Sequence, residues 1–206
     1  MIAIIDYAAG NLTSVKRALD YLNLPSMISS DAQELLRAER LIFPGVGHAT
    51  AAMAVLKERG LDVVIREAFA AGTPILGICL GTQIILSRSE EGDRECLGII
   101  EGSVPRFQLA DPTLKVPHMG WDAVTLIRQH PVLAGSRPGA EFYFVHSYYP
   151  QPADPTAVIG RCEYEINFPA IIGRDNLIGL QFHPEKSGPA GLAILKNFST
   201  WDGAAC

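Results

Sequence analysis

One cysteine of this chain stands where a nucleophile could work. The stretch 76-LGICLGTQ-83 places Cys79 between Gly77 and Gly81, directly after an apolar run. This spacing is the cysteine form of the sharp turn that presents a nucleophile between a strand and a helix. The helix would direct free N–H groups at the sulfur and favour thiolate, and the Leu80 amide could donate to an oxyanion. The alternative is a buried structural cysteine beside glycines that only allow close packing.

A thiol nucleophile needs a base and a group that orients the base. Near the C-terminus, 180-LQFHPEKS-187 places His183 after an apolar strand and Glu185 two residues later. Pro184 stiffens this turn, so the carboxylate could hold one imidazole nitrogen while the other faces Cys79. For this motif alone, a surface histidine beside a solvated glutamate is the alternative. Together with the cysteine turn, the motif predicts a Cys-His-Glu triad, because active sites of α/β sheets gather at the carboxyl ends of strands.

Other stretches are less specific. The turn 44-PGVG-47 could donate backbone N–H groups to an oxyanion, or it is a plain tight turn. His118 and His146 stand beside Met or aromatic residues, a pattern that by itself indicates packing. The chain has no C-x-x-C, and no P-C-x-x-C follows Glu185 as in a zinc deaminase, so we expect no metal. Phosphate-binding glycine motifs are also missing, and no cofactor is expected.

The elements that must position these residues alternate between strand and helix in the first half. Apolar strands are predicted over residues 1–6, 26–29, 40–43 and 73–78. Helices are predicted over 14–22 (SVKRALDYL) with Asn11 as the N-cap, and over 32–38, 49–59, 61–71 and 80–88. This alternation predicts an α/β fold with a mainly parallel central sheet flanked by helices.

The pattern changes after about residue 100. Strands joined by short loops are predicted within 121–127, 141–149, 156–164 and 168–173, before a last helix over 188–200. They indicate an antiparallel C-terminal part that packs on the parallel core or extends it. Since no linker or repeat divides the chain, we expect residues 1–206 to form one domain.

Composition excludes several classes of function. The chain has 206 residues, 48% of them hydrophobic, and a net charge of -5, which argues against nucleic acid as the main ligand. No apolar run reaches 18 residues, so no membrane span is expected. The start, MIAIIDY, has no basic segment and reads as a strand rather than a signal peptide. We therefore expect a cytoplasmic protein with reduced thiols.

The cysteine turn and the terminal motif together resemble the class I glutamine amidotransferases of the Cys-His-Glu type. Further stretches resemble one branch of them, the glutaminase subunits of imidazole glycerol phosphate synthase from histidine biosynthesis. These stretches are DYAAGNLTSV at 6–15, FPGVGH at 43–48, VPHMGWD at 116–122, YFVHSYY at 143–149 and LQFHPEKSG at 180–188. The similarity runs from end to end in matching order, and VPHMGW and YFVHSYY are its more specific parts.

The resemblance implies the three-layer class I glutamine amidotransferase fold and a glutaminase reaction. Cys79 would attack the side-chain amide of glutamine and form a glutamyl thioester with release of ammonia, while His183 moves the proton and Glu185 orients His183. The oxyanion-hole amides would come from Val46 or Gly47 and Leu80. The residues implied to hold glutamine are Gln83, His146 and Ser147.

The resemblance also implies a heterodimer. The partner would be the cyclase subunit of the synthase, a (β/α)8 barrel that receives the ammonia and makes imidazole glycerol phosphate and aminoimidazole carboxamide ribotide. The residues implied to contact the cyclase are Asn11, Met119, Trp121, Tyr143 and Lys186. Independently of the resemblance, this chain is too short, and too lacking in phosphate-binding motifs, to hold an acceptor site of its own.

The sequence departs from the family pattern at four positions. The departures are Ala8 for a frequent Gly, Ala49 for a frequent Phe, Thr82 for a common Met, and Asp122 for a frequent Asn.

Two alternative functions stay open. One alternative is a triad glutaminase that serves another synthase, such as those of pyridoxal phosphate or purine biosynthesis; VPHMGW and YFVHSYY count against it. The other is a non-catalytic subunit that retains the fold; the intact Cys79, His183 and Glu185 count against that.

Overall fold

A computed structural model describes residues 1–8 and 11–204 of the chain. Five parallel strands, four from its first half and β13 from near its C-terminal end, lie in the order β2-β1-β3-β4-β13. Their bounds are β1 (Ile2–Ile5), β2 (Ser26–Ser29), β3 (Arg40–Gly45), β4 (Ile75–Cys79) and β13 (Leu177–Leu180). Most of these strands are buried on both faces, which is why they read as short continuous apolar runs.

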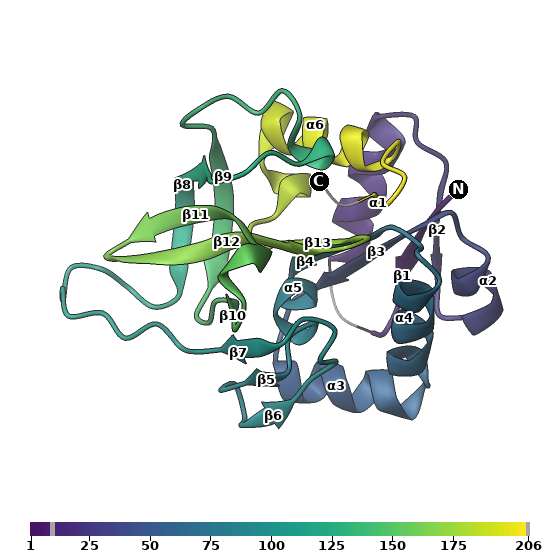
Figure 1. The fold of residues 1–206 in the computed structure, drawn as a ribbon, viewed down its shortest axis with the longest axis horizontal. Helices are drawn as coiled ribbons and strands as arrows, with labels where there is room; N and C mark the ends of the chain where they lie inside the picture. Colours follow the sequence, from purple (N-terminus) through teal and green to yellow (C-terminus); the bar gives the residue numbers. More distant parts are fainter. Residues whose placement is uncertain (9–10, 205–206) are drawn as a thin grey trace.

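Beyond β13 the same sheet continues with antiparallel strands, at the left of Figure 1. In order from β13 they are β12 (Ile166–Arg174), β11 (Val158–Tyr164), β8 (His118–Leu126) and β9 (Glu141–His146). The antiparallel part therefore extends the parallel core instead of packing on it. The predicted fold class, a mainly parallel sheet with an antiparallel C-terminal extension, is confirmed.

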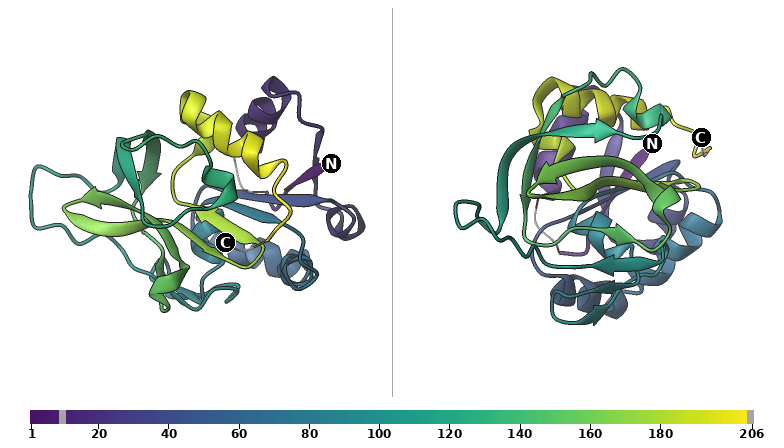
Figure 2. Two further views of the ribbon diagram at one scale, coloured as in Figure 1. Left: turned by 45° about the horizontal axis from the view of Figure 1, so that its top comes forward. Right: turned by 60° about the vertical axis from the view of Figure 1, so that its left-hand side comes forward.

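Helices cover both faces of the parallel part, giving three layers (Figures 1 and 2). The helices are α1 (Leu12–Tyr21) and α6 (Gly188–Phe198) on one face, and α2 (Ala32–Leu36), α3 (Ala49–Glu58) and α4 (Leu61–Ala70) on the other. A hydrophobic core lies on each face of the sheet, and alternate residues of β1 belong to different cores. Ile2 and Ile4 pack with α1 and α6, whereas Ala3 and Ile5 pack with α3 and α4.

Some boundaries differ from the sequence prediction. The helix after Cys79, α5, spans only Leu80–Ile84, and β3 continues through Gly45. After α5 the chain enters a small sheet in the order β10-β7-β5-β6, which the sequence did not predict. Its strands are β5 (Arg88–Ser89), β6 (Arg94–Glu95), β7 (Gly102–Val104) and β10 (Gln151–Pro152). Strands of two or three residues are too short to show a hydrophobic period.

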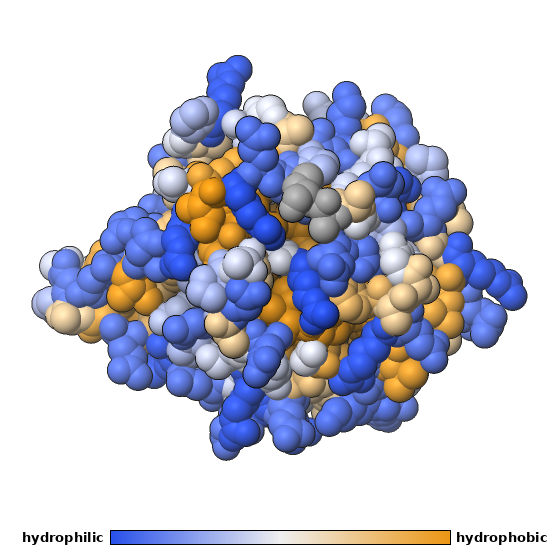
Figure 3. Space-filling model, viewed as in Figure 1, coloured by the Kyte–Doolittle hydropathy of each residue, from blue (hydrophilic) through white to orange (hydrophobic). Residues whose placement is uncertain are grey.

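Three 3₁₀ turns complete the described structure: η1 (Pro131–Leu133), η2 (Pro155–Ala157) and η3 (Pro184–Lys186). The third begins directly after His183, with Pro184 at its first position. In the part of the chain that the structure describes, no helix has the length and apolar character needed to cross a membrane. The face in Figure 3 is mostly hydrophilic, with hydrophobic residues in small patches.

Candidate active site

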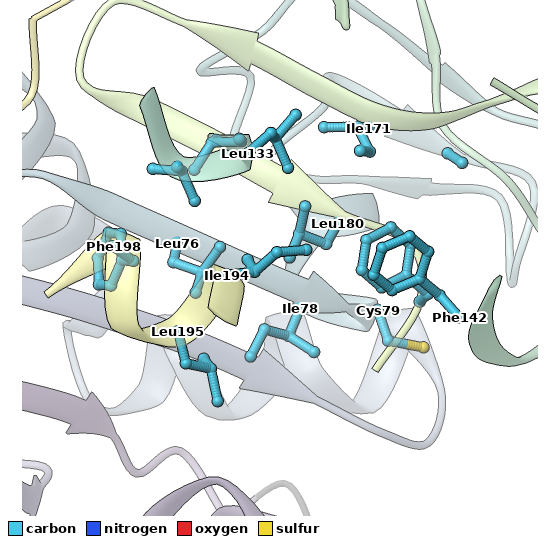
Figure 4. Packing of buried hydrophobic residues seen from close by; sticks show 14 of the residues in the cluster. Leu76, Ile78, Cys79, Leu133, Phe142, Ile171, Leu180, Ile194, Leu195 and Phe198 are labelled. Carbon is cyan, nitrogen blue, oxygen red and sulfur yellow. The ribbon is translucent and has the colours of Figure 1, made fainter. Parts of the chain in front are cut away.

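The strand-to-helix turn expected at Cys79 is present. Cys79 ends β4 and precedes α5, with φ 52° and ψ -109°, a conformation that L-residues rarely adopt and that stores backbone strain. Gly81 is required by packing, because a Cβ there would lie 1.9 Å from the carbonyl oxygen of Phe43. Figure 4 shows Cys79 at the margin of the buried cluster that includes Ile78 and Phe142. The glycine thus lets the helix approach the sheet and leaves the thiol at its carboxyl edge.

His183 and Glu185 form a buried pair. The His183 Nδ1 atom lies 2.7 Å from Glu185 Oε1, and both side chains are shielded from solvent. The side-chain amide of Asn11 donates to the same oxygen. Two atoms, His183 Nε2 and Glu185 Oε2, have no hydrogen-bond partner among the described residues. Because Nδ1 faces the carboxylate, Nε2 is the nitrogen left for proton transfer.

The surroundings of His183 favour its charged form. Burial alone lowers the pKa of this imidazole, but charge and hydrogen-bond interactions with the Cys79 sulfur and the Glu185 carboxylate outweigh burial and raise the pKa to about 10. This raised pKa favours the cationic form of the imidazole, which lies close enough to the sulfur to interact with it. This is the electrostatic arrangement that a cysteine nucleophile and its base require.

The other cysteines lack these features. Cys96 and Cys162 are buried, and burial raises the pKa of their thiols to about 11 and about 12. Cys206 lies outside the described residues. Among the described cysteines, only Cys79 combines a strained turn with a neighbouring imidazole.

A cavity of about 370 Å³ opens beside the sulfur and contains every oxyanion-hole and glutamine-binding residue expected from the sequence. Its lining is Val46, Gly47, Cys79, Leu80, Gln83, Glu91, Pro117, Val145, His146, Ser147 and Tyr148. Residues 46–47 reach it because Gly45 pairs with Cys79 at the ends of β3 and β4. Gly47 has φ 104°, in the left-handed region that favours glycine.

Hydrogen bonds fix one wall of this cavity. Gln83 Nε2 donates to the Tyr148 carbonyl at 2.8 Å, and His146 Nδ1 lies 2.8 Å from the same oxygen. His146 Nε2 is 3.2 Å from His118 Nδ1, and His118 Nε2 is 2.6 Å from Asp122 Oδ2. Burial lowers the pKa of His118, and lowers that of His146 to about 3. Both ring nitrogens of His146 are thus engaged within the protein, so this residue shapes the wall rather than offering a free nitrogen.

Four of the five residues expected at the partner interface share one face of the β8–β9 hairpin and its neighbour η3. Met119 and Trp121 are 62% and 51% exposed. Trp121 lies opposite Tyr143, with ring centroids 6.0 Å apart, and Lys186 Nζ is 5.7 Å from the Tyr143 ring centroid. The fifth residue, Asn11, contacts Glu185 instead. The predicted N-cap position of Asn11 at the start of α1 is confirmed, but at φ 76° its side chain makes no capping hydrogen bond.

The sequence interpretation missed two polar residues of the site. Glu91, in the charged loop after α5, lines the cavity, and its Oε2 accepts from the Ala49 amide at 2.6 Å. Gln181 is fully buried with its Nε2 3.7 Å from Cys79 Sγ. Gln181 could have been found, because the two-residue period of an extended chain places it on the same side as His183. Glu91 could not, since nothing in the sequence places that loop beside the cavity.

Comparisons with known proteins give the family of this chain. Residues 3–200 match the glutamine amidotransferase class-I family, and the chain belongs to that family. A solved glutamine amidotransferase has the same fold, with a TM-score of 0.75 at 16% identity over 97% of this chain and 100% of that chain. PurLQS from Thermotoga maritima gives a TM-score of 0.74 at 17% identity, covering 96% of each chain.

The relatives at higher identity define the branch. Imidazole glycerol phosphate synthase subunit HisH from Nitratidesulfovibrio vulgaris (strain Miyazaki F) is 50% identical over 203 residues, covering 96% of this chain and 95% of the relative. The subunit of the same name from Geobacillus thermodenitrificans is 48% identical, covering 96% and 94%. The chain is therefore a HisH-type glutaminase subunit, as the sequence motifs indicated.

Proposed function

We propose that this chain hydrolyses glutamine to glutamate and ammonia through a thioester on Cys79, as the glutaminase subunit of an imidazole glycerol phosphate synthase in histidine biosynthesis. One observation carries the proposal. The strained Cys79 turn, the His183–Glu185 pair and the cavity meet at the carboxyl edge of the sheet. Such an arrangement suits attack of sulfur on a carbonyl carbon more than any other reaction of these groups.

The triad residues have distinct parts in the reaction. Cys79 Sγ attacks the side-chain carbonyl carbon of glutamine, and the C–N bond breaks as His183 gives its proton to the leaving ammonia. A water molecule then attacks the thioester, His183 takes a proton from that water, and the sulfur leaves as thiolate. Glu185 accepts a hydrogen bond from His183 Nδ1, so that the proton on Nδ1 stays in place, and its negative charge stabilises the imidazolium.

The cavity suits the remaining groups of glutamine. The backbone amides of Val46 or Gly47 and of Leu80 would stabilise the oxyanion, since all three residues line the cavity beside Cys79. Gln83 and Ser147 would hold the substrate through polar groups, and His146 would contribute by shaping the wall against which glutamine lies. Glu91 is the acidic residue of the lining, and its carboxylate suits the α-ammonium group.

The ammonia needs an acceptor, which we assign to the cyclase subunit of a cytoplasmic heterodimer. The surface of Met119, Trp121, Tyr143 and Lys186 has exposed aromatic and apolar groups next to a cation, a composition typical of interface centres. Asn11 would lie between this surface and the triad, because its amide reaches Glu185.

The test compares two nitrogen sources in the complex with the cyclase. Cys79→Ala should abolish glutamine-dependent synthesis and leave ammonia-dependent synthesis intact, because the cyclase site is separate. Cys162→Ala, at a buried thiol away from the cavity, is the matched control and should keep both activities. If Cys79→Ala keeps glutamine-dependent turnover, or loses both activities, the proposed function is wrong.

A further inference from the structure

A fully buried amide contacts the sulfur of Cys79. Gln181 follows β13 and precedes His183 by two residues, and its side chain has no exposed surface. Its Nε2 lies 3.7 Å from Cys79 Sγ, within the range of a hydrogen bond to sulfur. A buried amide that lacked a partner would cost free energy, so this contact has to be accounted for.

The neighbouring groups fix which end of this amide faces the sulfur. The Tyr148 carbonyl can only accept, so the end of Gln83 that faces it must be the NH₂ group. That same NH₂ group faces Gln181 at 3.1 Å, so the Gln181 atom there must be the carbonyl oxygen. The NH₂ group of Gln181 is therefore turned toward Cys79. The Tyr148 carbonyl, three hydrogen bonds away from the sulfur, thus sets the direction of both amides.

We propose that Gln181 is a further catalytic residue, whose amide N–H donates to Cys79 Sγ and stabilises the negative charge on sulfur before attack and again when sulfur leaves the thioester. The proposal rests on the proposed role of Cys79 as the nucleophile. It differs from the roles already assigned. The oxyanion-hole amides serve the substrate oxygen, and His183 carries the proton, whereas Gln181 acts on the sulfur itself. A neutral donor can do this in both steps without giving up a proton.

Burial makes this single contact effective. The site is shielded from water, so few competing donors reach the sulfur, and a hydrogen bond is stronger in such surroundings. The same amide is held by Gln83, which lines the glutamine cavity. Gln181 therefore links the wall that holds the substrate to the atom that attacks it.

The test measures the rate of alkylation of Cys79 by iodoacetamide against pH, in the full chain, with the labelled residue identified by mass spectrometry. Gln181→Met removes the donor at similar volume and should move the pH midpoint up by about one unit, roughly a tenfold loss of thiolate at a fixed pH below it. Gln181→Glu turns a carboxylate toward the sulfur and should move the midpoint further in the same direction. In the complex, kcat for glutamine should fall by about the same factor, with a smaller change in KM.

Midpoints that stay unchanged in both variants overturn the proposal. Asn176→Leu is the control, because Asn176 is a buried amide that donates to the Phe69 and Thr73 carbonyls, away from the cavity. It should alter stability and leave the midpoint in place. If Cys79 is not the residue labelled first, the proposed function fails rather than this inference.

A measurement on the unaltered protein covers the case in which the variants do not fold. The side-chain NH₂ resonances of Gln181 should titrate with the alkylation midpoint and shift when Cys79 is alkylated. Those of Asn176 should do neither. If the chemical shifts of the Gln181 NH₂ group change neither with pH near the alkylation midpoint nor on alkylation of Cys79, the proposal is wrong.

Discussion

The Thr82 hydroxyl donates a 2.7 Å hydrogen bond to the backbone carbonyl of Leu180. Thr82 lies in α5, three residues after Cys79, and Leu180 ends β13, three residues before His183. The bond therefore joins the two elements that carry the nucleophile and the base. The Thr82 methyl group lies beside Gly179, where an added Cβ would come within 2.7 Å of it. The Thr82 hydroxyl therefore has a structural role at the site.

Replacing Thr82 by valine should therefore destabilise the packing of α5 against β13 beside the turn at Cys79. Valine keeps the branched shape but removes the donor, which costs about 0.5–1.5 kcal/mol of unfolding free energy. Thr82→Ser, which retains the hydroxyl, is the control for the bond. Chemical denaturation of both variants measures the difference. A valine variant as stable as the serine variant would show that the bond contributes nothing.

The raised pKa of His183 gives a second prediction. Its pKa is about 10 in the folded protein and about 6.5 in an unfolded chain, so folding favours the protonated imidazole. The stability it contributes is fully present below pH 6.5 and is lost as the pH rises from there through 10. NMR titration of the imidazole should give a midpoint far above 6.5. In Cys79→Ala the midpoint should fall, because the sulfur is the largest of the favourable contributions; an unchanged midpoint would contradict this assignment.

With Asp122 at its end, the row of hydrogen bonds through His146 and His118 needs one more proton than two neutral imidazoles carry. Three contacts join the Tyr148 carbonyl, His146, His118 and Asp122, and both ends accept, so three protons are needed. Two neutral imidazoles carry only two. Burial lowers the pKa of both rings, so with Asp122 ionised the third proton enters only below the ordinary histidine pKa of about 6.5. An asparagine at 122 could donate to His118 and complete the chain with neutral rings.

Asp122→Asn should therefore stabilise the protein by about 1 kcal/mol near pH 8. The advantage should shrink when the pH is lowered to 5, because a lower pH favours the third proton in the unaltered chain. Denaturant unfolding at the two pH values measures it. Asp122→Ala, which neither donates nor accepts, separates this effect from simple removal of charge. An asparagine variant with the same advantage at both pH values would refute the proton count.

The sequence predicted those parts of the site that a short, local stretch of residues determines. A glycine-flanked cysteine after an apolar run and the H-P-E motif each have a local cause, so the turn at Cys79 and the pairing of His183 with Glu185 could be foreseen. The contacts of Asn11 and Glu91 could not, because they join segments that are far apart in the chain. The helix-start pattern at Asn11 predicted a cap, but the tertiary contact with Glu185 took the side chain instead. His118 and His146 looked like packing residues because their hydrogen bonds form only once β8 pairs with β9.

The proposed partner surface can be tested with two residues of equal exposure. Trp121 is 51% exposed and lies opposite Tyr143, whereas Ile127 is 52% exposed just beyond the far end of β8. If the cyclase docks on Met119, Trp121, Tyr143 and Lys186, Trp121→Ala should weaken its binding at least about tenfold, as for an aromatic residue at an interface centre. Ile127→Ala removes a similarly exposed apolar side chain and should change the affinity little. Calorimetric titration of each variant with the cyclase decides between them, and equal losses for both would place the interface elsewhere.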